Sequence, residues 1–179
     1  NMKTKIGIVF GGRSGEHEIS VRSAGNVVCA FDKDKYELVP VAISPGGQWL
    51  NPADSVKLLS DEARSVIAED FQGYLGHGVG LGGDPSVRGF SLIGPAGSSN
   101  STLAIDVVFP VLHGTFGEDG TIQGMLEMAG LPYVGCGVLA SSCGMDKVVM
   151  KSLFHEAGLP MCKYVWFLRN EWEANNDLV

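Results

Sequence analysis

The 179-residue sequence lacks any apolar run approaching the ~20 residues that a helix needs to cross a bilayer. We therefore expect no membrane-spanning segment and no membrane partner. The sequence is also poor in basic residues: 13 Lys and Arg stand against 20 Asp and Glu, which gives a net charge of −7. Nucleic-acid-binding surfaces need clustered Lys and Arg, and no such cluster occurs here, so nucleic acid is not an expected partner.

Two other sequence signals are missing. The four cysteines, Cys29, Cys136, Cys143 and Cys162, have neither CxxC spacing nor the spacing of a metal site. We interpret them as reduced thiols, mostly buried, of a cytoplasmic protein. The glycine-rich stretch GGRSGE after the first predicted strand also lacks G-x-G-x-x-G spacing, which disfavours a nicotinamide-dependent oxidoreductase.

Glycine, in contrast, is abundant: there are 25 glycines, many of them at predicted turns from strand to helix. One stretch, IDVVFPVLHGTFGEDGTIQG at 105–124, organises the chain. Its apolar start is typical of a buried parallel strand. His113 follows at the carboxyl end of that strand, where open α/β sheets bind ligands, and Asp119 is placed to cap the next helix. Taken alone, the stretch is equally consistent with a binding site and with a tight turn that exposes a histidine.

Residues 5–10, KIGIVF, form a second apolar run, and the glycine-rich loop 11–18 follows at once. Two strands that each end in such a loop, with a histidine and carboxylates, suggest one shared rim. Glu18 is well explained by favourable electrostatics at a helix N-terminus, worth only ~0.3–1 kcal/mol. This explanation is weaker for Glu16, which lies inside the glycine loop.

The pattern around these loops predicts an opening β-α-β unit. Ser20 is expected to cap a helix that runs to about Phe31, and residues 36–43 form the next predicted strand. A small hairpin is predicted at 44–50, and a partly helical surface segment at 53–70.

Residues 71–101 contain many Gly and Ser residues and little periodicity, which predicts a surface insertion or a long loop. His77 lies within it and is expected to be exposed and without function. A helix is predicted at 121–129. Its inward-facing residues are expected to be Ile122, Met125, Leu126 and Ala129.

The last third of the sequence is predicted to be mainly helical. Residues 138–143 form one apolar helical turn, and Asp146 is expected to cap the next helix. The sequence AGLP occurs at 129–132 and again at 157–160, which indicates two helices ended by left-handed glycines. A strand at 164–168 and the start of a helix at 170–175 complete the prediction.

Three motifs agree in order and spacing: GGRSGEHEISVRSA at 11–24, HGTFGEDGTIQG at 113–124, and GMDK at 144–147 followed by AGLP at 157–160. Together they resemble D-alanine–D-alanine ligases, and most closely the longer members, which carry an insertion before the organising strand. The resemblance covers essentially the whole chain apart from residues 60–101. One such motif is weak evidence, whereas three in register are specific.

The resemblance implies an α/β fold. An N-terminal parallel-sheet, Rossmann-like (pre-ATP-grasp) domain would span residues 2–142, and residues 143–179 would open an ATP-grasp central domain. It also implies an activity: ATP phosphorylates the carboxylate of one D-alanine, the amine of a second attacks the acyl phosphate, and the dipeptide serves peptidoglycan synthesis. The implied cofactors are ATP and Mg²⁺, with the metal ligands expected past residue 179. The implied assembly is a cytoplasmic homodimer.

The resemblance also assigns roles to single residues. Glu16 matches the loop glutamate that holds the amino group of the first D-alanine, and Ser14 belongs to the loop that shapes this substrate site. His113 matches the histidine that contacts the first substrate near its carboxylate and acyl phosphate, where a donor would offset oxyanion charge. Lys147 matches a lysine near the ATP phosphates. Glu118 is interpreted as part of the loop architecture.

Two alternatives stay open. A D-alanine–D-lactate ligase shares these N-terminal motifs, because residues beyond this chain select the acceptor. The other is a non-catalytic chain that only binds an amino acid or a partner through the rim at 105–124. We expect the chain to be a fragment that does not turn over by itself.

Overall fold

The computed structural model describes residues 3–67, 70–94 and 101–174. Its centre is a three-stranded parallel sheet in the order β2-β1-β6, in which β1 is Thr4–Gly11, β2 is Tyr36–Ile43 and β6 is Val107–Pro110. Ile8 of β1 lies opposite Pro40 on one side and Phe109 on the other. These strands read as nearly continuous apolar runs because both faces of the sheet are covered. The predicted α/β sheet is confirmed.

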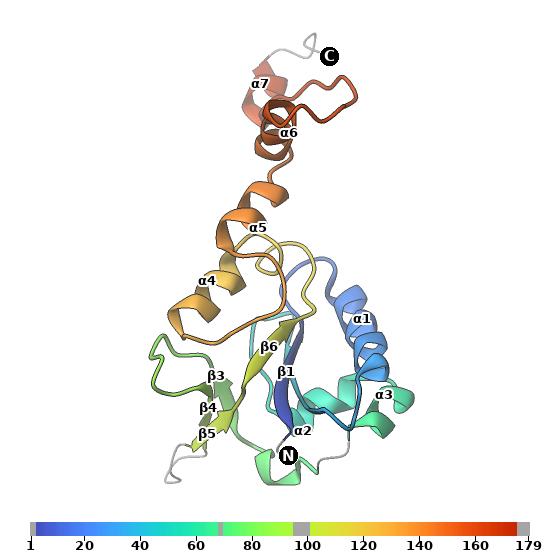
Figure 1. Ribbon diagram of the computed structural model, residues 1–179, viewed down its shortest axis with the longest axis vertical. Coiled ribbons are helices and arrows are strands. Elements are labelled where there is room, and N and C mark those ends of the chain that lie inside the picture. The colour runs from blue at the N-terminus through green and yellow to red at the C-terminus, as the bar shows by residue number, and fades with distance from the viewer. Residues whose placement is uncertain (1–2, 68–69, 95–100, 175–179) are drawn as a thin grey trace.

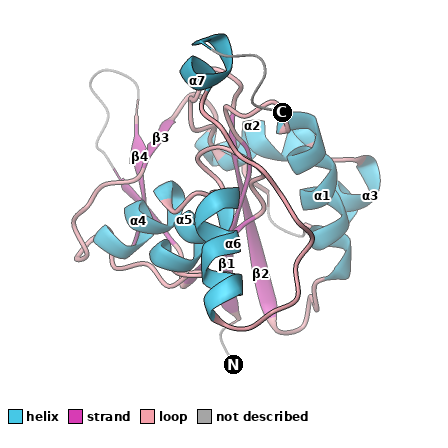
Figure 2. Ribbon diagram, turned by 90° about the horizontal axis from the view of Figure 1, so that it is seen from above, coloured by secondary structure: helices cyan, strands magenta, loops and turns pink. Residues whose placement is uncertain are grey.

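Alternate residues of β1 enter two different layers of the core. Ile6, Ile8 and Phe10 pack with α1 (His17–Ala30) and α3 (Asp61–Val66). Val9 points to the opposite face, which is covered by α4 (Thr121–Met128) and a second sheet. Figures 1 and 2 show this arrangement, with α1 and α3 on one side of the parallel sheet and α4 with the second sheet on the other.

The second sheet corrects the prediction of a long loop at 71–101. It is antiparallel, in the order β3 (Gly78–Gly80), β4 (Gly89–Ile93), β5 (Ser101–Ala104). Phe90 and Leu92 are buried, whereas Ser91 and Ile93 face outward or lie half-buried, so β4 has the alternation of a strand. The segment is short and surrounded by Gly and Ser, which concealed this alternation; residues 95–100 lie outside the described part.

His77, just before β3, is half-buried rather than exposed as predicted. Its Nδ1 atom is buried and has no hydrogen-bond partner within the described ranges. The segment leads directly into β3, and Asn51 holds its backbone by donating from Nδ2 to the His77 carbonyl (3.2 Å).

The segments between β2 and β3 agree better with the predictions. The amide of Ser44 donates to the carbonyl of Gln48 (2.8 Å), and Ile43 pairs with Trp49, which confirms the small hairpin. The partly helical segment consists of α2 (Pro52–Ser55), a 3₁₀ turn at Val56–Leu58 and α3, with a further 3₁₀ turn at Gln72–Tyr74.

The prediction that Ser20 caps α1 is wrong. Ser20 lies inside the helix and is fully buried. The helix begins earlier, at His17, with Glu16 at the N-cap position. The register of β1 with β6 ends at Val9 and Pro110, and the amide of Val111 donates to the carbonyl of Val9 (2.7 Å). The Ser20 hydroxyl continues the link between the two strands: it accepts from the Gly11 amide (2.7 Å) and donates to the Val111 carbonyl (2.5 Å).

α4 differs from its prediction at one residue. Ile122 and Leu126 are buried, and Gly130 ends the helix with φ +63°, as expected. Met125, however, is 38% exposed, and Gln123 is buried in its place, donating through Nε2 to the carbonyl of Gly117 (2.9 Å). The loop carbonyl offers a partner that lets the polar side chain take an inner position.

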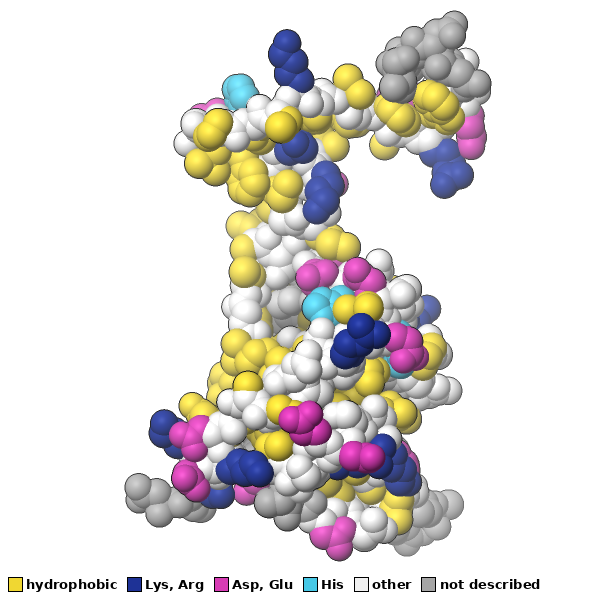
Figure 3. All heavy atoms as spheres, turned by 90° about the vertical axis from the view of Figure 1, so that its right-hand side faces the viewer, with side chains coloured by type: hydrophobic (Ala, Val, Ile, Leu, Met, Phe, Trp, Pro, Cys, Tyr) yellow, Lys and Arg dark blue, Asp and Glu magenta, His cyan; other side chains and the backbone are white. Residues whose placement is uncertain are grey.

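The C-terminal region contains α5 (Val138–Met145), α6 (Lys147–Glu156) and α7 (Arg169–Ala174). The Asp146 carboxylate accepts from the amides of Val148 (2.9 Å) and Val149 (3.0 Å), so the predicted cap is confirmed. Gly158 has φ +71°, the predicted left-handed conformation. The region projects from the body of the molecule, and hydrophobic side chains stand on its surface (Figures 1 and 3).

Residues 164–168 do not form the predicted strand; they are exposed and irregular. A strand needs a neighbour to pair its backbone groups, and the described chain places none beside them. The prediction that the cysteines are buried is wrong: Cys29, Cys136 and Cys162 are exposed and Cys143 is half-buried. No helix within the described ranges has the length and apolarity to cross a bilayer.

The bridge made by Ser20 yields a stability prediction. Ser20→Ala should leave a buried amide and a buried carbonyl unpaired, and should lower the free energy of unfolding by about 2–4 kcal/mol. Urea denaturation measures this change. Ser65→Ala, the same substitution on the exposed surface of α3, should change it by less than about 0.5 kcal/mol. Equal effects of the two substitutions would contradict the structural role of Ser20.

Candidate functional site

Two loops meet at the carboxyl ends of β1 and β6. Ser14, in the loop after β1, donates from its hydroxyl to the carbonyl of His113 in the loop after β6 (2.7 Å). The same hydroxyl accepts from the amide of Glu16 (3.2 Å). Because β1 and β6 are neighbouring parallel strands, residues 99 positions apart in sequence become direct neighbours. The predicted shared rim is confirmed.

Gly114 allows the two loops to approach closely. Its φ is +69°, and a Cβ atom there would lie 2.8 Å from the Oε2 atom of Glu16. The Glu16 carboxylate therefore lies against the backbone that follows His113. It makes no capping hydrogen bond to α1 and no ion pair within the described chain. An exposed carboxylate at a helix N-terminus, with its lone pairs free, is suited to hold a ligand's ammonium group.

His113 is half-buried, and its Nε2 atom lies 3.2 Å from the hydroxyl oxygen of Ser23 on α1. Ser23 is not among the site residues predicted from the sequence. Ser20 and Ser23 are three residues apart and so share a helix face, but only the structure shows that this face meets the end of β6.

Glu118 holds the loop in shape, as predicted, whereas the N-cap of α4 is Gly120 and not the predicted Asp119, which lies one residue earlier. Glu118 accepts through Oε2 from the amide of Gly114 (2.7 Å). Asp119 accepts from the amides of Phe116 (2.9 Å) and Thr121 (3.0 Å), the latter being the first residue of α4. Burial raises the pKa of Asp119, but the hydrogen bonds from Phe116 and Thr121 outweigh it, and the pKa lies below its ordinary value of 3.8.

Lys147, the first residue of α6, is exposed and lines a cleft of about 660 Å³. Ser23, His113 and Glu118 line the same cleft. The structure therefore brings Lys147 and His113 to one cavity, while Ser14 and Glu16 contact the His113 loop without lining it. The cleft is open to solvent, and Lys147, His113 and Glu118 contribute charged or polar side chains to a lining that is otherwise largely apolar.

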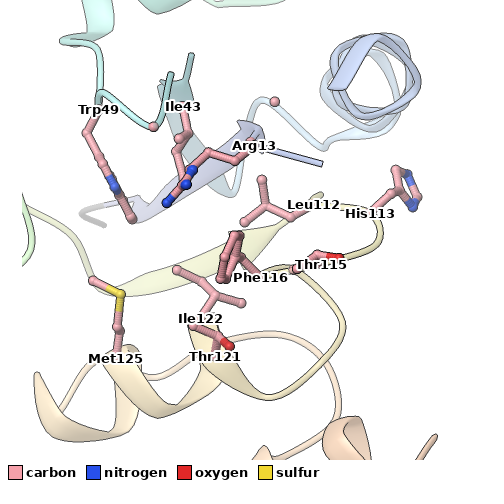
Figure 4. A pocket seen from close by; sticks show the side chains of 14 residues that line it. Arg13, Ile43, Trp49, Leu112, His113, Thr115, Phe116, Thr121, Ile122 and Met125 are labelled. Atoms are coloured by element: carbon pink, nitrogen blue, oxygen red, sulfur yellow. The ribbon is translucent and has the colours of Figure 1, made fainter. Parts of the chain in front are cut away.

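A second pocket, of about 200 Å³, lies beside the same loops and is mostly apolar. Its walls include Ile43, Trp49, Ile122 and Met125. The guanidinium of Arg13 lies 5.1 Å from the ring centroid of Phe116, a cation–π contact. Figure 4 shows Arg13 pointing into this pocket, whereas His113 points away from it, toward the blue helix α1. The exposed Met125 of α4 is thus explained as a wall of this pocket.

No group of three or more His, Cys, Asp and Glu side chains in residues 3–67, 70–94 and 101–174 could hold a metal ion.

Comparison with known proteins shows the family to which this chain belongs. Residues 5–136 match the family model described as the D-Ala D-Ala ligase N-terminus. The chain belongs to this family. A D-alanine–D-alanine ligase of Natranaerobius thermophilus is 41% identical over 175 residues, covering 98% of this chain and 45% of the relative. One from Bacillus cytotoxicus is 43% identical over 178 residues, covering 98% and 46%. The chain thus spans about half the length of these curated relatives.

Solved structures of the ligase family agree in fold. The VanG D-Ala:D-Ser ligase from Enterococcus faecalis superposes with a TM-score of 0.76 at 35% identity, covering 97% of this chain and 47% of that structure. The ligase from Helicobacter pylori, at 20% identity, has a TM-score of 0.74, covers 98% and 51%, and supports the fold alone.

The lowered pKa of Asp119 predicts a pH dependence. Since the pKa of the folded state lies below the ordinary 3.8, the stabilisation by ionised Asp119 is complete above 3.8 and is lost as the pH falls through the folded-state pKa. Asp119→Asn should therefore destabilise the protein at neutral pH, and the difference in free energy of unfolding should shrink below pH 3.8.

Urea denaturation at a series of pH values measures this difference. Asp34→Asn is the control, because the Asp34 carboxylate accepts no hydrogen bond in the described chain. A difference for Asp119→Asn that is the same at every pH would contradict the assignment.

Proposed function

We propose that the protein containing this chain is an ATP-dependent ligase that joins two D-alanines through an acyl phosphate, for peptidoglycan synthesis. The observation that carries the proposal is the meeting of Glu16 and the His113 loop at the sheet edge, in a chain of the ligase family. The Glu16 side chain is exposed, and His113 lines the cleft beside it. The unpaired carboxylate and the imidazole are complementary to the two ends of such a molecule.

In this proposal the first D-alanine binds with its ammonium group against the Glu16 carboxylate. Its own carboxylate then lies toward His113. That carboxylate oxygen takes the γ-phosphoryl group of ATP, and ADP leaves. The amine of the second D-alanine attacks the acyl carbon and phosphate departs. A donor at His113 would stabilise the negative charge that develops on the acyl oxygen.

We propose further that Lys147 faces the phosphates of ATP, since this residue lines the same cleft as His113. Mg²⁺ would neutralise phosphate charge, and its ligands are expected past residue 179. The division into domains at 2–142 and 143–179 remains a prediction. The apolar surface of residues 143–174 supports it: Val165 is 71% exposed and Trp166 is 57% exposed, as expected of residues that another part of an ATP-grasp region covers.

The homodimer, the cytoplasmic location and the identity of the acceptor are carried over from the family as proposals. The acceptor is the part most open to variation, because the neighbour from Enterococcus faecalis is a D-Ala:D-Ser ligase. D-Alanine is the proposed acceptor because the curated relatives cited above are D-alanine–D-alanine ligases.

A coupled assay of ADP release tests the proposal. The full-length protein that contains this chain, with ATP and Mg²⁺, should release ADP only when D-alanine is added, and mass spectrometry should detect D-alanyl-D-alanine. L-Alanine should give no release, and the 179-residue chain alone should be inactive. A requirement for D-lactate or D-serine as acceptor would reassign the product. Absence of release with every acceptor would overturn the ligase function.

Glu16→Gln removes the negative charge that faces the ammonium group and should raise KM for D-alanine by about 10- to 100-fold, with a smaller effect on kcat. Glu18→Gln is a matched control, because it makes the same change two residues away, on an exposed position in the first turn of α1. It should leave both constants within about 2-fold. If the two variants behave alike, Glu16 has no role in binding.

A further inference from the structure

The ring of His113 has one hydrogen-bond partner in the described chain, the hydroxyl of Ser23, 3.2 Å from Nε2. The main chain of His113 is held separately, by the hydroxyl of Ser14 at its carbonyl. Ser14 therefore fixes where the residue sits, and Ser23 fixes how its imidazole is turned.

This second contact matters because the χ2 torsion of histidine is broad. Without a partner, the ring samples two orientations that exchange nitrogen and carbon positions. A hydrogen bond to one ring nitrogen selects one orientation and one tautomer, and so decides which nitrogen is presented to a ligand.

Ser23 is itself well placed to impose that choice. It lies on α1 next to Ala24, which is fully buried against the sheet, and α1 is tied to both strands by Ser20. Glu16 stands at the N-terminus of the same helix. One rigid element thus carries the carboxylate proposed to bind the ammonium group and the hydroxyl that orients the imidazole.

We propose that Ser23 is a positioning residue of the ligase: its hydroxyl holds the His113 imidazole in the orientation that serves the acyl-phosphate step. Ser23 acts only through His113. The proposal rests on the role proposed for His113, and its test separates the two.

The test is a double-mutant cycle on the full-length protein, with kcat and KM for D-alanine measured by ADP release. His113→Ala should lower kcat strongly. Ser23→Ala should lower kcat by about 3- to 10-fold, the effect of one neutral hydrogen bond, with little change in KM. Ser23→Thr, which keeps the hydroxyl, should restore most of the turnover. In the His113→Ala background, Ser23→Ala should have no further effect.

Asn26→Ala is the matched control, because Asn26 lies on the exposed side of α1; it should leave kcat unchanged. A readout independent of turnover is the ¹⁵N imidazole spectrum, in which the His113 signal is identified by its loss in His113→Ala. Ser23→Ala should convert a single tautomer into a mixture, and Ser23→Thr should not.

The outcomes separate the hypotheses. Equal losses from Ser23→Ala in both backgrounds, or an unchanged imidazole spectrum, would overturn positioning by Ser23 while leaving the ligase function intact. Normal kcat in His113→Ala would overturn the role of His113 and, with it, that of Ser23. Failure of the wild type to release ADP concerns the proposed function alone, because the spectrum still reports whether Ser23 orients the ring.

Discussion

The structure around the site depends on one buried hydroxyl. Ser20 bonds the last amide of β1 and the first carbonyl after β6, where the two strands stop pairing with each other. Backbone groups that leave a ladder inside a protein need other partners, and here a helix supplies them both. These two hydrogen bonds therefore fix the position of α1 relative to the loops that follow β1 and β6. Glu16, Ser23 and His113 lie where they do because α1 and the ends of both strands are tied at this point.

Much of this arrangement follows from the sequence. The apolar runs of β1, β2 and β6 predict a buried parallel sheet, and parallel strands place their carboxyl ends on one edge, so the meeting of the two loops could be expected. The caps at Asp146, Gly130 and Gly158 were also predictable, because capping depends on residue type and local backbone geometry. Family resemblance supplied the roles predicted for Glu16, His113, Ser14 and Lys147. Periodicity and spacing alone do not assign a role to a single residue.

Several of the errors have a common physical cause: they depend on contacts between segments distant in sequence. Phe90 and Leu92 become core residues only when β4 lies against the parallel sheet. Ser20 has the residue type of a cap but is used as a bridge, because backbone groups far away in the chain need its hydroxyl. Ser23 is unremarkable in the sequence, since its partner is 90 residues away. Residues 164–168 show the reverse case, in which strand-forming residues have no neighbouring strand.

The pairing of β1 with β6 has a consequence for how the protein folds. Ile6 lies opposite Val107, so the first strand of the chain is completed on one side only after about a hundred further residues have been made. Such non-local closure is entropically costly and slows folding. During synthesis, the opening β-α-β unit emerges with one edge of its central strand unpaired. The rim at which the two loops meet can assemble only after that edge has been closed, so its appearance would be a late step of folding.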